Sequence, residues 1–274
     1  MQQPDTIRIL ALGDCVGRPG RRALREGIPV LREHKRIDFV VANVENAVNG
    51  WGLNPAKAAQ ILECGVDVMT SGDHIRDRRE IDPYLESETR VLKPLNYRDM
   101  PGRGVYVYDG PRGVKIGIAN IAGKLFMPCP DPVEGRPFDM GNPLLLADEA
   151  IAAMGNAPIK LVDLHGEVTS EKVALGWYLD GRASAVWGTH THVQTADETV
   201  LPKGTGYITD LGFTGGHKSV LGRDVGRVIN KLLDRSPAYM EVADEWPQLD
   251  GAIFEIETVT GRCVSVERVR HRIE

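Results

Sequence analysis

Short apolar runs that stop abruptly at acidic, amide or histidine side chains recur along this chain of 274 residues. Residues 183–187, for example, lead directly into Gly188-Thr189-His190-Thr191-His192. Runs of this length that are rich in β-branched and aromatic residues predict buried strands. Similar runs occupy residues 7–13, 37–42, 66–70 and 159–164, and helical patterns follow most of them. This alternation predicts an α/β fold whose strand ends meet at one edge of a sheet.

Two pairs of segments also predict antiparallel strands. Residues 105–108 and 114–119 alternate in polarity, and the Gly- and Pro-containing turn 109–113 between them indicates a hairpin. Residues 252–258 and 263–269 form a second such pair around a turn at 259–262. We therefore expect a mixed sheet. Because 42% of the residues are hydrophobic and no repeat or linker is visible, we expect residues 1–274 to form a single domain.

The helical patterns lie at residues 21–33, 55–64, 143–154, 170–177 and 225–233. Asn54-Pro55 is a typical helix start, with Asn as the N-cap and Pro as the first helical residue. Residues 124–142 are rich in Pro, Gly and Asp and predict a long loop. A loop of this length is a functional lid, a disordered segment or a plain surface excursion.

Composition excludes several classes of function. The net charge of −5 and the isoelectric point near 5.9 argue against stable binding of long nucleic acid through a basic field. The four cysteines form no Cys-x-x-Cys pair, and the N-terminus does not resemble a secretion signal, so we expect a reduced, cytoplasmic protein. No apolar run approaches the roughly 20 residues that span a bilayer. We expect no membrane association.

The first strand and the helix after it do not form a nucleotide-binding loop. Gly13, Gly17 and Gly20 match neither the dinucleotide fingerprint nor the P-loop. What remains is Asp14, a carboxylate at the end of the first strand, where ligands collect in open α/β sheets. A single Asp at this place is also an ordinary turn or N-cap residue.

Side chains that can bind metal ions follow five of the predicted strands. They are Asp14, Glu45, Asn46, Asp73, His74, His165, His190 and His192. On extended backbone His190 and His192 point the same way, which suits a pair of metal ligands. The alternative is that these are ordinary loop residues. So many oxygen and imidazole ligands exceed the needs of one tetrahedral ion and suit two ions about 3.5–4 Å apart, as in hydrolases that act at phosphorus.

Several of these segments resemble the calcineurin-like metallophosphoesterases, and within them the YmdB-like bacterial phosphodiesterases. The matching segments are Gly13-Asp14, Asn43-Val44-Glu45-Asn46, Gly72-Asp73-His74, His165 with Thr169-Ser170-Glu171-Lys172, and residues 188–197. The resemblance implies a four-layer α/β/β/α sandwich with two central mixed sheets and a dinuclear metal site at the strand ends. It also implies hydrolysis of cyclic nucleotides, including 2′,3′-cyclic and, by extension, 3′,5′-cyclic nucleoside monophosphates.

The resemblance assigns a role to each site residue. One metal ion is held by Asp14, Asn46 and His192, the other by Asp73, His165 and His190, and Glu45 bridges the two. The two cations lower the pKa of a shared water, which attacks phosphorus as hydroxide opposite the leaving oxygen. His74 is the acid that protonates that oxygen, and Asp77 orients His74.

The chain departs from the family pattern at two places. The wider superfamily has Asp-x-His in its first motif, whereas this chain has Asp14-Cys15-Val16, so Asn46 is expected to substitute for the missing histidine. The usual Asn-His of the third motif is Asp73-His74 here. The additional carboxylate is expected to bind divalent ions more tightly and to make the site less electrophilic.

These observations define the expected cofactors and partners. We expect two divalent metal ions, with manganese or iron favoured by the mixed ligands and magnesium or zinc as alternatives. The expected partner is a small phosphodiester or cyclic nucleotide, and a homo-oligomer remains open. The alternative from another class is a regulatory or RNA-associated binding protein that keeps a structural metal site. An amidohydrolase-like barrel is discounted because the His-x-His pair comes late in the chain.

Overall fold

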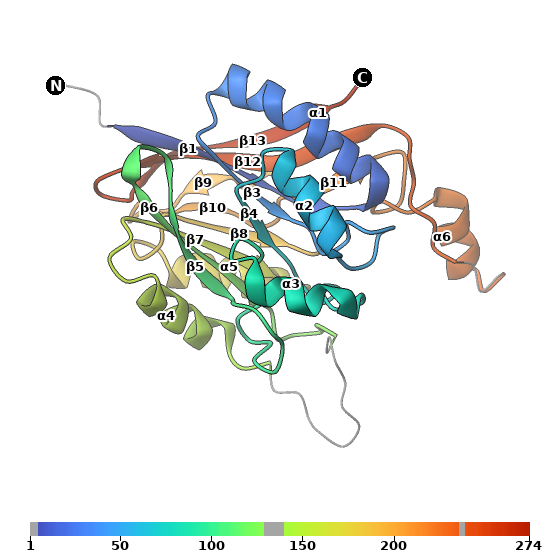
Figure 1. Ribbon diagram of the computed structural model, residues 1–274, viewed down its shortest axis with the longest axis horizontal. Coiled ribbons are helices and arrows are strands. Elements are labelled where there is room, and N and C mark those ends of the chain that lie inside the picture. The colour runs from blue at the N-terminus through green and yellow to red at the C-terminus, as the bar shows by residue number, and fades with distance from the viewer. Residues whose placement is uncertain (1–4, 129–139, 236–238) are drawn as a thin grey trace.

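The apolar run at the N-terminus forms the central strand of the first of two sheets. The computed structural model describes residues 5–128, 140–235 and 239–274 (Figure 1). β1 (Thr6–Leu12) pairs antiparallel with β12 (Pro247–Glu257) and parallel with β3 (Phe39–Asn43). The strand order is β2-β11-β12-β1-β3-β4, and β13 also pairs with β12. The remaining strands are β2 (Asp14–Cys15), β4 (Val68–Thr70), β11 (Phe213–Gly216) and β13 (Cys263–Arg272).

The second sheet is built around three parallel strands. They are β6 (Lys115–Ala122), β7 (Ile159–His165) and β8 (Ala185–Thr189). β5 (Val105–Asp109) pairs antiparallel with β6, and β9 (Thr199–Val200) pairs antiparallel with β10 (Gly206–Ile208), giving the order β5-β6-β7-β8-β10-β9. Both predicted hairpins are thus confirmed, since β12 and β13 are also antiparallel. Both sheets are mixed.

Six α-helices and two 3₁₀ turns connect the strands of the described residues. They are α1 (Gly17–Lys35), α2 (Pro55–Glu63), η1 (Arg79–Ile81), α3 (Asp82–Ser87), η2 (Pro111–Gly113), α4 (Pro143–Ala153), α5 (Thr169–Tyr178) and α6 (Val225–Leu232). Asn54 caps α2 as expected, because its side chain accepts a hydrogen bond from the Lys57 N–H at 2.9 Å. α1 begins earlier than the expected residue 21, since the Pro19 ring is tolerated in a first helical turn.

Alternate residues of the central strands enter different apolar layers. Ile9 of β1 and Val41 of β3 belong to a buried cluster with Ile118 and Trp187 of the second sheet. These residues fill the space between the sheets. Because successive side chains of a strand point to opposite faces, the next residues of β1 and β3 pack elsewhere. Strands that are buried on both faces explain the nearly continuous apolar runs in the sequence.

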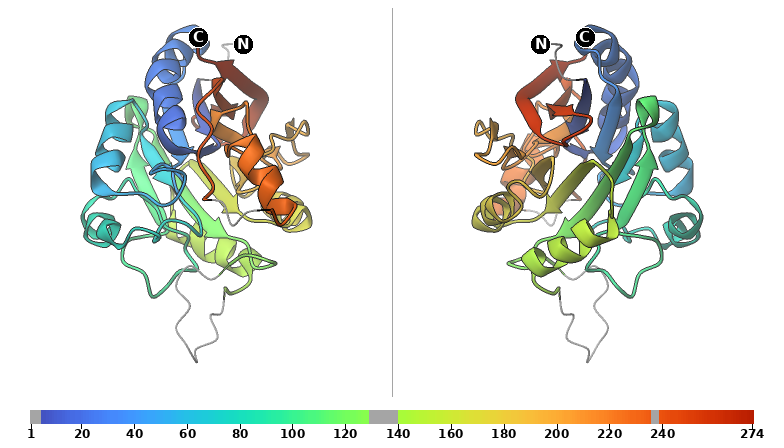
Figure 2. Two further views of the ribbon diagram at one scale, coloured as in Figure 1. Left: turned by 90° about the vertical axis from the view of Figure 1, so that its right-hand side faces the viewer. Right: turned by 90° about the vertical axis from the view of Figure 1, so that its left-hand side faces the viewer.

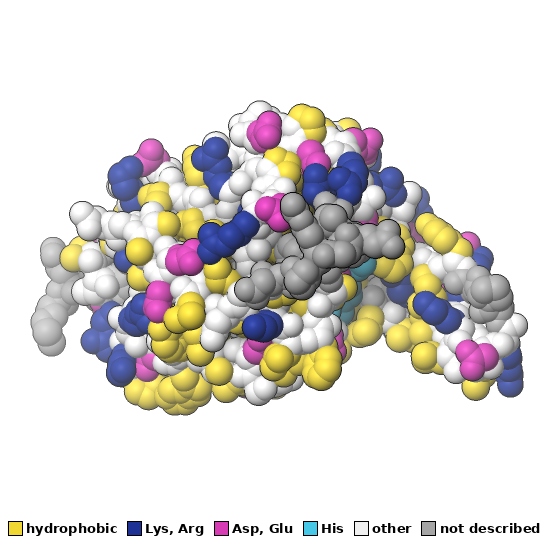
Figure 3. All heavy atoms as spheres, turned by 90° about the horizontal axis from the view of Figure 1, so that it is seen from below, with side chains coloured by type: hydrophobic (Ala, Val, Ile, Leu, Met, Phe, Trp, Pro, Cys, Tyr) yellow, Lys and Arg dark blue, Asp and Glu magenta, His cyan; other side chains and the backbone are white. Residues whose placement is uncertain are grey.

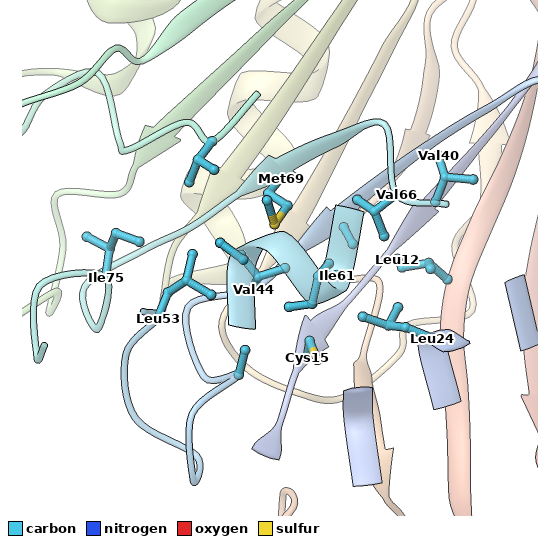
Figure 4. Close-up of a cluster of buried hydrophobic side chains, with 14 of the residues drawn as sticks. Leu12, Cys15, Leu24, Val40, Val44, Leu53, Ile61, Val66, Met69 and Ile75 are labelled. Atoms are coloured by element: carbon cyan, nitrogen blue, oxygen red, sulfur yellow. The ribbon is translucent and has the colours of Figure 1, made fainter. Parts of the chain in front are cut away.

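Helices cover the outer faces of the two sheets. Leu12 and Val40 pack with Leu24 of α1 and Ile61 of α2 on the first sheet (Figure 4). On the second sheet, Leu164 packs with residues of α4 and α5. Figure 2 shows α1 and α2 together on one side of the molecule. α6 lies apart from both sheets (Figure 1).

Two further expectations concern the 124–142 loop and membrane-spanning helices. Most of the predicted 124–142 loop, namely residues 129–139, lies outside the described residues. None of the helices in the described part of the chain is both long and apolar enough to cross a membrane.

Candidate metal centre

The ends of strands from both sheets carry the side chains that the sequence singled out. Asp14 lies on β2, Glu45 and Asn46 follow β3, and Asp73 and His74 follow β4. From the second sheet, His165 ends β7, and His190 and His192 follow β8. Seen from below, the surface shows histidine side chains at a recess on this face (Figure 3). The topology therefore delivers these residues to one region, as strand ends in α/β folds do.

Four of them form a compact cluster that could hold a metal ion: Glu45, Asp73, His165 and His190. Nε2 of His165 lies 3.1 Å from Oδ1 of Asp73, 3.3 Å from Oε1 of Glu45 and 3.0 Å from Nδ1 of His190. Ligands about 2.0–2.2 Å from one cation are separated from each other by roughly 3.0–3.5 Å. The spacing and the chemistry of these donors therefore fit a divalent ion.

Gly72 makes this close approach possible. A Cβ atom at residue 72 would lie 2.1 Å from Nε2 of His165 and 2.5 Å from Oε2 of Glu45. Any other residue would displace two of the candidate ligands, so the glycine of Gly72-Asp73-His74 is required by the centre itself.

Neighbours of the second sheet fix the ring of His165. The Thr189 hydroxyl donates to Oδ1 of Asp163 at 2.8 Å, so its oxygen accepts from Nδ1 of His165 at 3.0 Å. The amide nitrogen of Asn43, itself a donor, lies farther from Nδ1, at 3.3 Å. Because Nδ1 keeps its proton in this arrangement, the neutral imidazole can present the lone pair of Nε2 to a cation.

Asp14, Asn46 and His192 provide a second group of possible ligands. Oδ1 of Asp14 lies 3.7 Å from Nε2 of His192 and 3.8 Å from Nδ1 of His165. Oδ1 of Asp14 and Oδ1 of Asn46 are buried and have no hydrogen-bond partner within the described part of the protein. Buried acceptors without partners are costly unless something else satisfies them, and a cation would do so.

The backbone of the His-x-His segment differs from the expected extended form. β8 ends at Thr189, and His190 and His192 have φ values of 94° and 59°. The expectation that the two rings point the same way from extended backbone is therefore wrong. Nδ1 of His190 lies 3.3 Å from Asp73, whereas His192 approaches Asp14. The turn divides the pair between the two groups of ligands.

A buried ion pair holds this turn. Nζ of Lys172 on α5 lies 2.6 Å from Oδ2 of Asp210, and both side chains are almost fully buried. The same carboxylate oxygen accepts from the hydroxyl of Thr191 at 2.6 Å. Thr191 is the residue between the two histidines, so Lys172 and Asp210 fix their backbone. Sequence analysis had noted Lys172 only as part of a matching segment.

His74 lies beside the cluster and is not part of it. Its Nδ1 contacts Oδ2 of Asp77 at 2.8 Å, and its backbone N–H donates to Oε2 of Glu45 at 2.9 Å. Nε2 lies 3.6 Å from Oδ2 of Asp73. The ring thus keeps one nitrogen on Asp77 and directs the other toward the candidate centre.

Glu167 is a neighbour of the centre that sequence analysis did not identify. Its Oε2 lies 3.1 Å from Nε2 of His190, and the side chain is half exposed. The only signal in the sequence was its place two residues after His165.

In the candidate centre, the acidic and histidine side chains each favour the charged form of their neighbours. Burial alone would lower the pKa of His165, but the charge of Glu45 and the hydrogen bond to Asp73 raise it well above the ordinary value. Burial alone would raise the pKa of Asp73, but hydrogen bonds from His165 and His190 hold it far below its usual range. Three carboxylates gathered in one buried place favour positive charge, whether it comes from protons or from a metal ion.

Fold and site together define a class of protein. Two packed mixed sheets with a cluster of carboxylates and histidines at their strand ends are characteristic of metallophosphoesterases. The chain belongs to the YmdB-like protein family, whose family model matches residues 10–269.

Individual proteins are similar to this one in sequence or in fold over nearly the whole chain. The sequence is 40% identical over 265 residues to a 2′,3′-cyclic-nucleotide 2′-phosphodiesterase of Bacillus subtilis (strain 168), with 96% of each chain covered. The fold superimposes on the crystal structure of a phosphatase from Mycoplasma pneumoniae with a TM-score of 0.88 at 30% identity, covering 98% of this chain and 95% of the other. A hypothetical protein from Thermus thermophilus gives a TM-score of 0.87 at 37% identity, with coverages of 98% and 100%.

Proposed function

We propose that this protein is a metal-dependent phosphodiesterase that hydrolyses cyclic nucleotides. The observation that carries the proposal is the set of donor atoms 3.0–3.3 Å from Nε2 of His165, with His74 beside it. The similarity to a 2′,3′-cyclic-nucleotide 2′-phosphodiesterase supports 2′,3′-cyclic nucleoside monophosphates as substrates. Activity on 3′,5′-cyclic nucleotides is a further part of the proposal.

We also propose the finer architecture that the resemblance implied. The three apolar layers, one between the sheets and one under the helices on each outer face, support a four-layer α/β/β/α sandwich. The family match over residues 10–269 supports a single metallophosphoesterase domain covering 1–274.

In this proposal the ligands divide between two metal ions. Asp73, His165 and His190 would hold one ion, Asp14, Asn46 and His192 would hold the other, and Glu45 would be a ligand of both. The unpaired acceptors of Asp14 and Asn46 support the second site. Manganese or iron suits the mixed donors, with magnesium or zinc as alternatives. When bound, such ions supply Lewis acidity, which neutralises phosphoryl oxygens and makes water a better nucleophile.

His74 then acts on the leaving group. A water molecule that has lost a proton to solvent forms a bond to phosphorus through its oxygen while the bond from phosphorus to the leaving oxygen breaks. The leaving oxygen takes a proton from Nε2 of His74, and His74 regains a proton from solvent. Asp77 holds Nδ1 and so keeps the ring in place. In a 2′,3′-cyclic substrate the leaving oxygen is a ribose hydroxyl, which is a poor leaving group and needs this proton.

Turnover with added manganese tests the proposal. We expect hydrolysis of bis-p-nitrophenyl phosphate and of 2′,3′-cyclic AMP, strongly reduced in Glu45→Gln and retained in His34→Gln, a control on the exposed end of α1. His74→Ala should keep its metal. Its turnover rate on the cyclic nucleotide should fall by roughly two to four orders of magnitude. Metal binding without turnover on any diester would instead favour the binding protein with a structural metal site.

A further inference from the structure

Trp51 lies directly against His74. The two ring centroids are 4.8 Å apart and the planes meet at 82°, which is an edge-to-face contact. Trp51 comes from the loop that begins with Glu45 and Asn46, so one loop supplies both candidate ligands and this aromatic ring.

Arg223 holds the indole in place. Its guanidinium carbon lies 4.2 Å from the centroid of the Trp51 ring. The guanidinium donates to the carbonyl oxygens of Gly50, at 2.5 Å, and of Met240, at 3.3 Å. Gly50 has a φ of 84°, and a Cβ there would lie 2.1 Å from Nη1 of Arg223. The residue before Trp51 must therefore be glycine for the arginine to reach the ring.

Further contacts tie Trp51 to the segment that carries His74. Nε of Arg78 donates to the backbone oxygen of Trp51 at 3.2 Å. Within its own loop, the Trp51 N–H donates to the carbonyl oxygen of Val48 at 3.0 Å. Leu221, two residues before Arg223, contacts one of the candidate ligands: its carbonyl oxygen lies 3.1 Å from Nδ1 of His192. The segment from Leu221 to Arg223 thus reaches both the ligand turn and the aromatic ring.

We propose that Trp51, clamped by Arg223, is a positioning residue for His74. A single hydrogen bond from Nδ1 to Asp77 still allows the imidazole to rotate about that contact. The Trp51 indole packs against the ring and restricts this rotation, so that Nε2 stays directed at the leaving oxygen. This proposal rests on the proposed role of His74 as the proton donor. Misplacement of a reacting group by about 1 Å can cost on the order of 100-fold.

The proposal predicts how the rate depends on the leaving group. Trp51→Ala should lower kcat for ribose and alkyl leaving groups by about 10–100-fold, with little change in KM. The loss should be small for p-nitrophenolate, which needs little protonation. Trp51→Phe keeps an aromatic ring and should retain most of the rate. Arg223→Met, which removes the clamp without altering the ring, should act in the same direction with a smaller effect.

Trp246→Ala is the matched control. The Trp246 ring also lies under an arginine, with the guanidinium carbon of Arg272 at 5.1 Å, and it is exposed just before β12, outside the segments that carry His74 and the candidate ligands. Its rates should equal those of the wild type. In a His74→Ala background, Trp51→Ala should cause no further loss, because a positioning residue acts only through the group it positions. A loss of equal size for all leaving groups, or an additive loss in the double variant, would overturn the proposal.

A measurement without substrate separates this proposal from the proposed function. Relaxation of ¹³C-labelled histidine rings should show His74 ordered in the wild type and in Trp51→Phe, and more mobile in Trp51→Ala. An equally ordered His74 ring in Trp51→Ala would refute the positioning role even if the protein hydrolyses diesters. A wild type that turns over no diester, with the ring mobile only in Trp51→Ala, would refute the proposed function and leave the contact standing.

Discussion

Asp73 directs its two carboxylate oxygens to different partners. Oδ1 lies 3.1 Å from Nε2 of His165, in the candidate centre, and Oδ2 lies 3.6 Å from Nε2 of His74. The carboxylate of Asp73 therefore adds negative charge to the candidate centre and also to the surroundings of the proposed acid.

Asp73→Asn tests the contribution of this charge to metal binding. The amide oxygen can occupy the same place while one negative charge is lost, so we expect the dissociation constant for manganese to rise roughly tenfold. Titration of metal-free protein measures it. Asp77→Asn is the control, because Asp77 contacts His74 and none of the four clustered ligands, and its affinity should equal that of the wild type. Equal affinities for Asp73→Asn and wild type would place Asp73 outside the metal shell.

Asp250 of β12 gives a prediction about pH and stability. Burial raises its pKa to about 6, against 3.8 as the ordinary value. The fold therefore favours the protonated form, whose contribution is complete below about pH 4 and is lost as the pH rises through 6. Asp250→Asn stays neutral, so at pH 8 it should be more stable than the wild type by up to about 3 kcal/mol, with no gain near pH 4.

Urea unfolding at the two pH values measures this difference. Asp99→Asn makes the same charge change at an exposed position and should leave the stability unchanged at both. A loss of stability in Asp250→Asn at pH 8 would show that Arg270, whose Nε lies 3.6 Å from Oδ1 of Asp250, more than offsets the cost of burial.

Among the elements, α5 connects the surface of the second sheet to the ligand turn after β8. Lys172→Met should leave Asp210 buried without its cation, which typically costs about 3–5 kcal/mol of unfolding free energy. Metal affinity should fall as well, since Asp210 fixes Thr191 between the two histidines. Equilibrium unfolding of the metal-free protein and a metal titration measure the two effects.

The control for Lys172→Met is an exposed ion pair just beyond the same helix. Nη2 of Arg182 lies 2.5 Å from Oδ1 of Asp148, at a similar distance but with both side chains about 40% exposed. Arg182→Met should change stability little, because water screens exposed pairs. Similar losses in both variants would mean that burial does not decide the strength of the Lys172 pair.

The elements that sequence predicts well are those that local pattern determines. The apolar runs predict β7 and the two strands of the β5–β6 hairpin, and a Gly-Pro turn joins the hairpin strands. β7 ends at His165, and α2 begins directly after Asn54, as the sequence indicates. The two residues of β2 and the four of β11 are too short to give a pattern, and they pair only because the sheet brings them together.

The orientation of the site residues could not be predicted in the same way. The positive φ values of His190 and His192 depend on Lys172 and Asp210, which are distant in sequence. The contact of Trp51 with His74 likewise depends on Arg223, more than 170 residues later in the chain. Which residues gather at the centre follows from strand ends, but which atoms face each other is set by tertiary contacts.

At the scale of the whole molecule, the candidate centre joins the two sheets. Asp14, Glu45 and Asp73 come from β2, β3 and β4 of the first sheet, whereas His165 and His190 come from β7 and β8 of the second. Besides the apolar layer, a hydrogen bond links the two sheets: the Thr70 hydroxyl of β4 donates to the Asp163 carboxylate of β7. A cation held by ligands from both sheets would therefore cross-link them.

Metal removal should consequently destabilise the whole fold. A ligand that binds only the folded state at 100 times its dissociation constant stabilises by about 2.7 kcal/mol per site. For a domain of this size we expect one such site to raise the melting temperature by roughly 5–10 °C. Calorimetry of chelator-treated protein with and without manganese measures the shift.

Variants from the two sheets show whether the cation joins them. Asp73→Ala of the first sheet and His190→Ala of the second should each reduce the metal-dependent rise in melting temperature, because each removes a ligand of the same ion from one side of the cross-link. His34→Gln should show the full rise, since His34 is an exposed residue near the end of α1. If His190→Ala kept the full rise while Asp73→Ala lost it, the ion would be bound by the first sheet alone, and the fold would not depend on the metal to hold its sheets together.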